Sequence, residues 1–224
     1  GTQQKDRFTT VRLLLVWLFA SMTSLTAQTA AAMPTPGPQL AQEPRVARAL
    51  LWLERNTDWV TQQHIRITET PAPPFEETRR GMLLKKMLEE AGLRCRTDEV
   101  GNIVCERAGA RQKAAGREVK DVVLISAHLD TVFPPGTDVR VRKEGGRLLA
   151  PGISDNSSGL AALLAVARAL QEAKARTHAT IVFTANVGEE GEGNLRGMRK
   201  LAETYGGRLR AVIAIDGPSS DHVT

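Results

Sequence analysis

The chain has 224 residues and a formal net charge of +5, with 42% hydrophobic, 25% charged and 4% aromatic residues. This length and hydrophobic content suffice for one sizeable domain with its own core. The low aromatic content argues against a surface that stacks single-stranded bases. Residues 1–32 carry +2 of the charge, and the remaining +3 forms no basic stripe, so we expect no nucleic-acid partner.

The first 32 residues have the pattern of a secretory signal peptide. Basic residues precede an apolar run at 13–20, and Ala30-Ala31-Ala32 offers a cleavage site. A membrane-spanning helix needs roughly 20 apolar residues, so we expect no stable span after cleavage. An uncleaved anchor is the alternative. The predicted organisation is a signal peptide (1–32), a linker (33–44) and a catalytic domain (45–224) of an exported protein, periplasmic or secreted.

Both ends of the sequence suggest part of a longer protein. The chain begins with Gly1 and stops at Thr224, shortly after a carboxylate that ends a predicted strand. We therefore expect the domain to be incomplete at its C-terminus.

Two helical stretches come first in the predicted domain. Apolar residues recur at helical spacing through residues 46–67, and the proline-rich run 70–74 ends that stretch. A further helix is expected from Glu76 to Gly92, since acidic residues favour a helix N-terminus and glycine commonly ends a helix.

A β-hairpin with its turn near residues 98–102 follows and places Cys95 opposite Cys105. An exported protein could form a disulfide there. Adjacent strands suit disulfides poorly, however, and two free buried thiols are the preferred interpretation.

The segment 121–216 alternates between strand and helix patterns. Short runs rich in β-branched residues predict buried strands, and amphipathic stretches between them predict helices. The strands are expected at 122–127, 181–187 and 211–215, the helices at 156–170 and 195–205, and a hairpin turn at 143–147. This alternation predicts an α/β fold with a doubly wound, mostly parallel sheet and flanking helices.

Each of these three strands runs into metal-binding residue types. The first leads to His128 and Asp130, the second to Glu189 and Glu190, and the third to Asp216. Ligands bind beyond the carboxyl ends of the strands in such sheets. Carboxylates crowded at one edge repel each other unless cations hold them, so the sequence predicts a metal site with more than one ion.

Every one of these residues also has an ordinary interpretation. His128 and Asp130 could be a solvated pair, Asp155 the N-cap of the next helix, and Glu189-Glu190 an acidic first helical turn. Asp216 could be a turn residue. Their joint occurrence favours two zinc-like ions that share a carboxylate, with Asp155 able to bridge them.

The segments 126–132, 152–156 and 188–191 resemble the dinuclear zinc metallopeptidase family of aminoacylase, peptidase T and glutamate carboxypeptidase. The resemblance covers about residues 45–220 and implies the N-terminal part of a catalytic domain. The metal ligands that it implies are His128, Asp155, Glu190 and Asp216. His128 and Asp216 would hold one zinc ion and Glu190 the other, with Asp155 between them; Co²⁺ or Mn²⁺ could replace Zn²⁺.

The resemblance also implies the reaction. Glu189 is the implied general base, which then protonates the leaving amine, and Asp130 orients His128. The expected function is hydrolysis of a peptide or N-acyl amide bond, with a peptide or an N-acyl amino acid as substrate. The family further implies a cis peptide at Asp155–Asn156 and a homodimer formed through an additional domain.

One feature of the family has no match in the sequence. A later histidine, which follows an inserted smaller domain, completes the zinc site of Glu190. His222 follows Asp216 too closely for that role, and His64 and His178 are expected to be structural or solvated. We therefore expect the given sequence to bind one metal ion poorly and to turn over little substrate.

Two alternatives stay open at the level of sequence. The segment 155–159 also resembles the related zinc aminopeptidases. A non-catalytic binding protein that keeps the fold is the second alternative, although binding alone would not require Glu189 as a base.

Overall fold

The computed structural model describes residues 38–217, except residues 111, 115, 116 and 120. The predicted signal segment and His222 lie outside the described residues. Within the predicted linker, helix α2 occupies Pro38–Ala41. Every helix in the described ranges is too short or too polar to cross a lipid bilayer.

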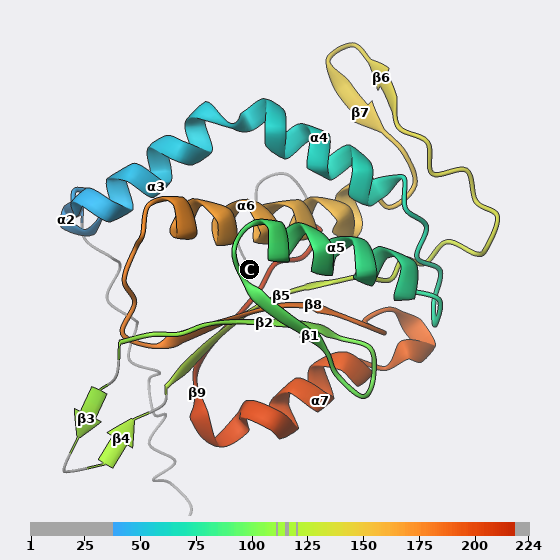
Figure 1. Ribbon diagram of the computed structural model, residues 1–224. Coiled ribbons are helices and arrows are strands. Elements are labelled where there is room, and N and C mark those ends of the chain that lie inside the picture. The colour runs from blue at the N-terminus through green and yellow to red at the C-terminus, as the bar shows by residue number, and fades with distance from the viewer. Residues whose placement is uncertain (1–37, 111, 115–116, 120, 218–224) are drawn as a thin grey trace, which may run out of the picture. The chain divides into compact units, whose positions relative to one another are not determined.

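A five-stranded sheet forms the centre of the fold (Figure 1). In spatial order its strands are β1 (Arg94–Thr97), β2 (Ile103–Arg107), β8 (Thr180–Asn186), β5 (Val122–His128) and β9 (Leu209–Ala214). β8, β5 and β9 are parallel, whereas β1 and β2 join antiparallel. The predicted α/β class is confirmed, and the sheet is mixed because the first hairpin pairs with its edge.

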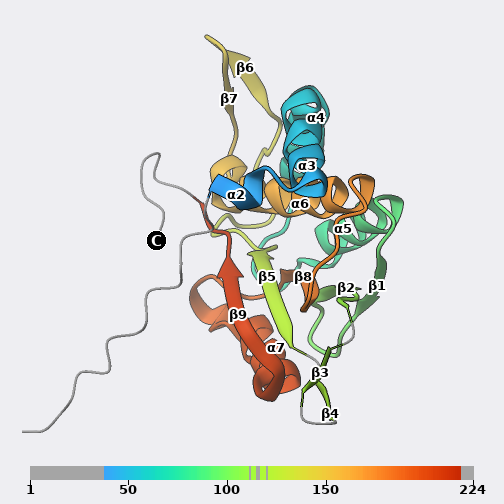
Figure 2. The ribbon, with the colours of Figure 1, turned by 90° about the vertical axis from the view of Figure 1, so that its left-hand side faces the viewer.

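Helices cover both faces of this sheet (Figures 1 and 2). On one face lie α5 (Thr78–Glu90) and α6 (Gly159–Glu172), with α3 (Pro44–Arg55) and α4 (Thr57–Thr68) packed outside α6. The opposite face is covered by α7 (Arg196–Tyr205). The helical stretch predicted over 46–67 divides at Asn56, whose side-chain amide donates to the Trp52 carbonyl at 2.7 Å.

The alternating strand sequence builds a separate apolar core on each face. On β5, Ile125 and Ala127 join the core under α5 and α6, and Leu124 joins the core that contains Leu201 and Tyr205 of α7. Successive strand residues point to opposite faces, so one apolar run supplies both cores. Burial on both faces holds the ends of β5 and β8, and hence the residues that follow them, in fixed positions. The prediction of a buried strand at 211–215 is wrong, because β9 lies at the edge of the sheet and most of its residues are exposed.

The first hairpin has the predicted register, with Cys95 paired to Cys105. The preferred interpretation of two free thiols is wrong, because the structure contains a Cys95–Cys105 disulfide. Their Cα atoms are 4.2 Å apart, as in the closer kind of antiparallel pair, where side chains approach each other. Our objection from adjacent-strand geometry does not hold for such a pair.

Two further hairpins extend from the fold (Figure 1). The turn predicted at 143–147 joins β6 (Arg142–Glu144) to β7 (Arg147–Leu149). The hairpin of β3 (Gln112–Ala114) and β4 (Arg117–Val119) was not predicted.

Candidate metal centre

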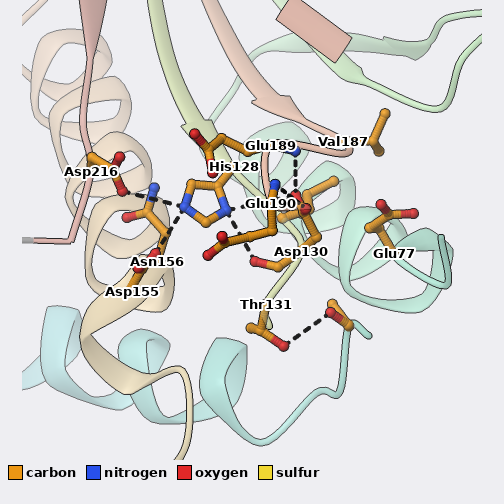
Figure 3. A network of polar contacts seen from close by, with 12 residues as sticks. Glu77, His128, Asp130, Thr131, Asp155, Asn156, Val187, Glu189, Glu190 and Asp216 are labelled. Atoms are coloured by element: carbon orange, nitrogen blue, oxygen red, sulfur yellow. Dashed lines mark hydrogen bonds and ion pairs between the residues drawn. The ribbon is translucent and has the colours of Figure 1, made fainter. Parts of the chain in front are cut away.

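The predicted site residues meet at the carboxyl edge of the three parallel strands. His128 ends β5, while Glu189 and Glu190 follow β8 and Asp216 follows β9. Asp155 reaches the same place from the irregular turn Ile153–Ser158, just before α6. Figure 3 shows these side chains around the imidazole ring of His128.

His128 lies between the carboxylates of two other chain segments. Its Nε2 atom is 2.9 Å from Oδ1 of Asp155 and 3.3 Å from Oδ1 of Asp216. The imidazole is buried, whereas both aspartates are exposed. Burial disfavours the charged ring, but Asp130, Asp155 and Asp216 together raise the pKa of His128 to about 9. Three carboxylates thus favour a cation at this ring.

Two groups of candidate ligands share His128. One contains Asp155 and Asp216, the other Glu189 and Glu190, and within each group the ligand atoms lie within 4.8 Å of one another. Burial raises the pKa of Glu190, and neighbouring carboxylates raise it further. Asp155 has the largest effect among these carboxylates. A bound cation would remove this repulsion, so the donor set fits divalent metal.

Asp130 connects the His128 segment to the two glutamates. Its carboxylate is fully buried and lies 3.6 Å from Nδ1 of His128. Oδ1 accepts the Glu189 amide at 3.1 Å and Oδ2 accepts the Glu190 amide at 2.8 Å. Burial opposes ionisation, but the His128 ring and then these two amides prevail and lower the pKa of Asp130. Besides facing the imidazole, Asp130 therefore fixes the backbone that carries both glutamates.

Comparison with known proteins supports the family that the motifs predicted. Residues 124–223 match the model described as Peptidase family M20/M25/M40. This segment is similar to the M20 peptidase family. All the predicted ligands, together with Glu189 and Asp130, lie within the matched residues.

Two curated relatives agree with the M20 assignment. The chain is 30% identical over 125 residues to a putative LysW-lysine/LysW-ornithine hydrolase of Pyrococcus abyssi, across 56% of this chain and 32% of that protein. It is 36% identical over 80 residues to carboxypeptidase G2 of Pseudomonas sp., across 35% of this chain and 19% of that protein. The chain thus spans about a third or less of these relatives.

Solved structures carry the same fold. A tripeptidase from Staphylococcus aureus is 26% identical and superposes with a TM-score of 0.55, across 71% of this chain and 43% of that chain. The predicted fold class is therefore confirmed as that of the M20 peptidases, with the described residues forming part of the domain.

The Asp155 segment contains the cis peptide that the resemblance implied, between Asp155 and Asn156. The Asp155 carboxylate faces His128, and Asn156 caps the helix instead: its Oδ1 accepts the Gly159 amide at 3.1 Å. Its Nδ2 donates to the Ile215 carbonyl at 2.8 Å. In place of the N-cap bond considered for Asp155, the structure has a bond from the first turn of α6 to Asn156, which also ties this turn to the residue before Asp216.

Three residues that the sequence analysis missed hold the loop with the glutamates. Asn102 of the first hairpin accepts the Val187 amide at 3.0 Å and donates to the Gly197 carbonyl at 3.0 Å. Arg196 donates to Glu77 at 2.6 Å. The loop is thereby fastened at both ends. No local pattern could reveal these contacts, because each joins segments about 85 to 119 residues apart.

The loop backbone itself is closely packed against Arg196. Gly188 has a φ of 61°, and a Cβ atom there would collide with the Arg196 side chain. The positive φ favours glycine at this turn, and any larger residue would also have to displace the Arg196 side chain.

The remaining described histidines lie outside the ligand groups. His64 of α4 donates through Nε2 to the Ile153 carbonyl at 2.6 Å, which makes it structural as predicted. His178 precedes β8 and so lies at the opposite end of the sheet from His128.

A small cavity of about 110 Å³ adjoins the site. Its lining includes His128, Glu189 and Asp216 together with the apolar side chains of Leu195 and Met198. The cavity brings apolar surface directly beside the candidate base.

Proposed function

We propose that the protein is a metal-dependent hydrolase of the M20 family that cleaves a peptide or N-acyl amide bond. The observation that carries this proposal is the position of the His128 Nε2 atom, within 3.3 Å of carboxylates from two different segments. The chain covers a third or less of its curated relatives, so the activity is proposed for the whole protein.

The donor set supports two zinc ions. His128 and Asp216 would hold one ion and Glu190 the other, with Asp155 reaching both. Imidazole and carboxylate ligands suit zinc, and Co²⁺ or Mn²⁺ can replace it. When bound, such a pair of ions would polarise the scissile carbonyl and lower the pKa of a bound water.

Glu189 is the proposed general base. Burial, then nearby carboxylates, raise its pKa, with His128 opposing them. A carboxylate with a raised pKa accepts a proton from water and returns it to the leaving amine more readily. The amide of Glu189 is fixed on Asp130, so the base is held in place while its carboxylate stays free to move the proton.

The experiment uses the purified whole protein. It measures bound zinc and the hydrolysis of dipeptides, tripeptides and N-acyl amino acids. Glu189→Gln should bind zinc but lose activity by 10²-fold or more, on the order of a general base's contribution. Glu192→Gln is the matched control, because Glu192 is exposed on the turn that follows. A protein that binds no zinc, or a Glu189→Gln variant with full activity, would contradict the proposal.

We further propose export of the protein, supported by the signal pattern in residues 1–32 and by the Cys95–Cys105 disulfide, since disulfides persist in oxidising compartments. N-terminal sequencing of the protein from a fractionated culture tests this: cytoplasmic protein that retains residues 1–32 would contradict it. A homodimer stays a prediction that light scattering can check.

A further inference from the structure

Arg80 is a fully buried cation on α5. Its Nε donates to the Thr70 carbonyl at 2.8 Å, Nη1 to the Leu129 carbonyl at 2.9 Å and Nη2 to the Thr68 carbonyl at 3.5 Å. A buried arginine costs free energy unless its donors and charge are compensated. Its position thus needs a reason beyond packing.

The contact with Leu129 brings Arg80 to the metal centre. Leu129 stands between His128 and Asp130 in the chain. Its amide donates to the Asn186 carbonyl at 2.7 Å, and its carbonyl accepts from Arg80. The backbone between two site residues is therefore held on one side by β8 and on the other by the guanidinium.

Hydrogen bonds extend this support from Asp130 to the loop 187–191, which carries both glutamates and is here called the catalytic loop. The buried Asp130 carboxylate accepts the amides of Glu189 and Glu190. Any movement of residue 129 would shift Asp130 and, through it, both glutamates. Arg80 thus lies at the start of a continuous series of hydrogen bonds that ends at the candidate base and a candidate metal ligand.

The positive charge of Arg80 also stabilises Asp130 in its buried position. Burial lowers its pKa to about 10, and the negative charge of Asp130 opposes that shift. The side chain consequently stays protonated at neutral pH and offsets the buried negative charge of Asp130. At its other end, the guanidinium meets carbonyls at and beyond the end of α4, where a cation is favourable.

Arginine is suited to this position because its planar group donates in several directions at once. A lysine could keep the charge and only part of the hydrogen bonding.

We propose that Arg80 is a positioning residue for the metal centre, which sets the place of the His128–Asp130 backbone and, through Asp130, of Glu189 and Glu190. The expected effect of Arg80 on metal binding rests on the proposed function. Its effect on the position of the backbone can be measured in the metal-free protein.

The test compares Arg80→Met and Arg80→Lys with Arg107→Met. Arg107 is a suitable control because it is a partly buried arginine that, like Arg80, donates to other segments, here to Gln171 at 2.9 Å and to the Ala175 carbonyl. It pairs with Ile181, near the start of β8, and so lies away from the metal centre. Loss of either arginine should lower stability, but only loss of Arg80 should alter the site.

Two measurements separate position from general stability. The first is amide hydrogen exchange of the metal-free protein in segments 128–132 and 187–191. The second is zinc affinity by competition with a chromophoric chelator, with the visible spectrum of the cobalt-loaded protein as a report on ligand geometry.

Arg80→Met should speed exchange in both segments, change the cobalt spectrum and weaken zinc binding by about 10- to 100-fold, as expected when a residue that supports metal ligands is lost. Arg80→Lys should give intermediate values, and Arg107→Met should match the wild type in all three.

The proposal is overturned if Arg80→Met exchanges, binds zinc and absorbs like the wild type, or if Arg107→Met changes the site equally. If Arg80→Met does not fold, Arg80→Lys decides, and wild-type values in that variant overturn the proposal. A wild-type protein that binds no zinc would refute the proposed function, and the exchange data would still decide the role of Arg80.

Discussion

The imidazole of His128 and the carboxylate of Asp155 lie 2.9 Å apart, although one ends β5 and the other precedes α6. The aspartate is exposed, so its place at the ring is not explained by packing. The metal ion proposed above would account for it, since a cation would bind both ligands at once.

Asp155→Asn should therefore weaken zinc binding by at least about tenfold, since an amide lacks the negative charge that holds the ion. Chelator competition measures the affinity. Asp138→Asn removes an exposed carboxylate elsewhere and serves as the control. Equal zinc affinities in the two variants would argue against Asp155 as a ligand.

The raised pKa of His128 predicts a pH dependence of stability in the metal-free protein. The pKa in the folded protein is about 9, against 6.5 for an ordinary histidine side chain. The stabilisation is fully present below pH 6.5 and is lost as the pH rises through about 9, because the folded state holds the proton more tightly.

Urea unfolding of the apo protein between pH 6 and 9.5 measures this loss. His128→Gln should remove most of the dependence. Zinc affinity should show the opposite pH dependence and increase as the pH rises, because the metal ion competes with the proton for the His128 ring. A free energy of unfolding that does not change with pH in the metal-free wild type would contradict a protonated His128 in the folded state.

Reduction of the Cys95–Cys105 disulfide should lower the free energy of unfolding by about 2–4 kcal/mol, because the bond limits the unfolded chain over a short loop. Thermal unfolding with and without a reductant measures the change, and the double variant Cys95→Ser/Cys105→Ser should behave like the reduced protein and not respond to reductant. Identical melting temperatures with and without reductant in the wild type would contradict this prediction.

Asn102→Ala should lower the free energy of unfolding by roughly 1–3 kcal/mol, since it leaves the buried Val187 amide and Gly197 carbonyl without their partner. Because these groups flank the catalytic loop, activity should fall as well. Gln62→Ala on the exposed side of α4 is the control. An Asn102→Ala protein as stable as the control variant would show that solvent replaces both bonds.

The sequence alone predicted most of the sheet and the convergence of the candidate ligands. Apolar runs that end in His128, Glu189 and Asp216 are local signals, and the parallel arrangement of their strands brings them to one edge. The joined strands of the first hairpin were also predicted, but the state of its cysteines was not, because it depends on how closely the paired Cα atoms approach.

The supporting residues could not be predicted from sequence. Arg80, Asn102 and Arg196 act through bonds to distant segments, and nothing near them in the chain marks those partners. The sequence also could not show which of Asp155 and Asn156 bonds to the start of α6. Both residue types cap helices, and only the position of His128 in the fold decides which one faces it.

The double attachment of Asn156 has a practical consequence for redesign. One amide side chain spaces two candidate ligands, because it bonds both the start of α6 and the residue before Asp216. A search for variants with altered metal preference could therefore vary Asp155 and Asp216 freely only while Asn156 is kept. A library that randomises all three positions would mostly sample proteins in which the ligands are no longer the right distance apart.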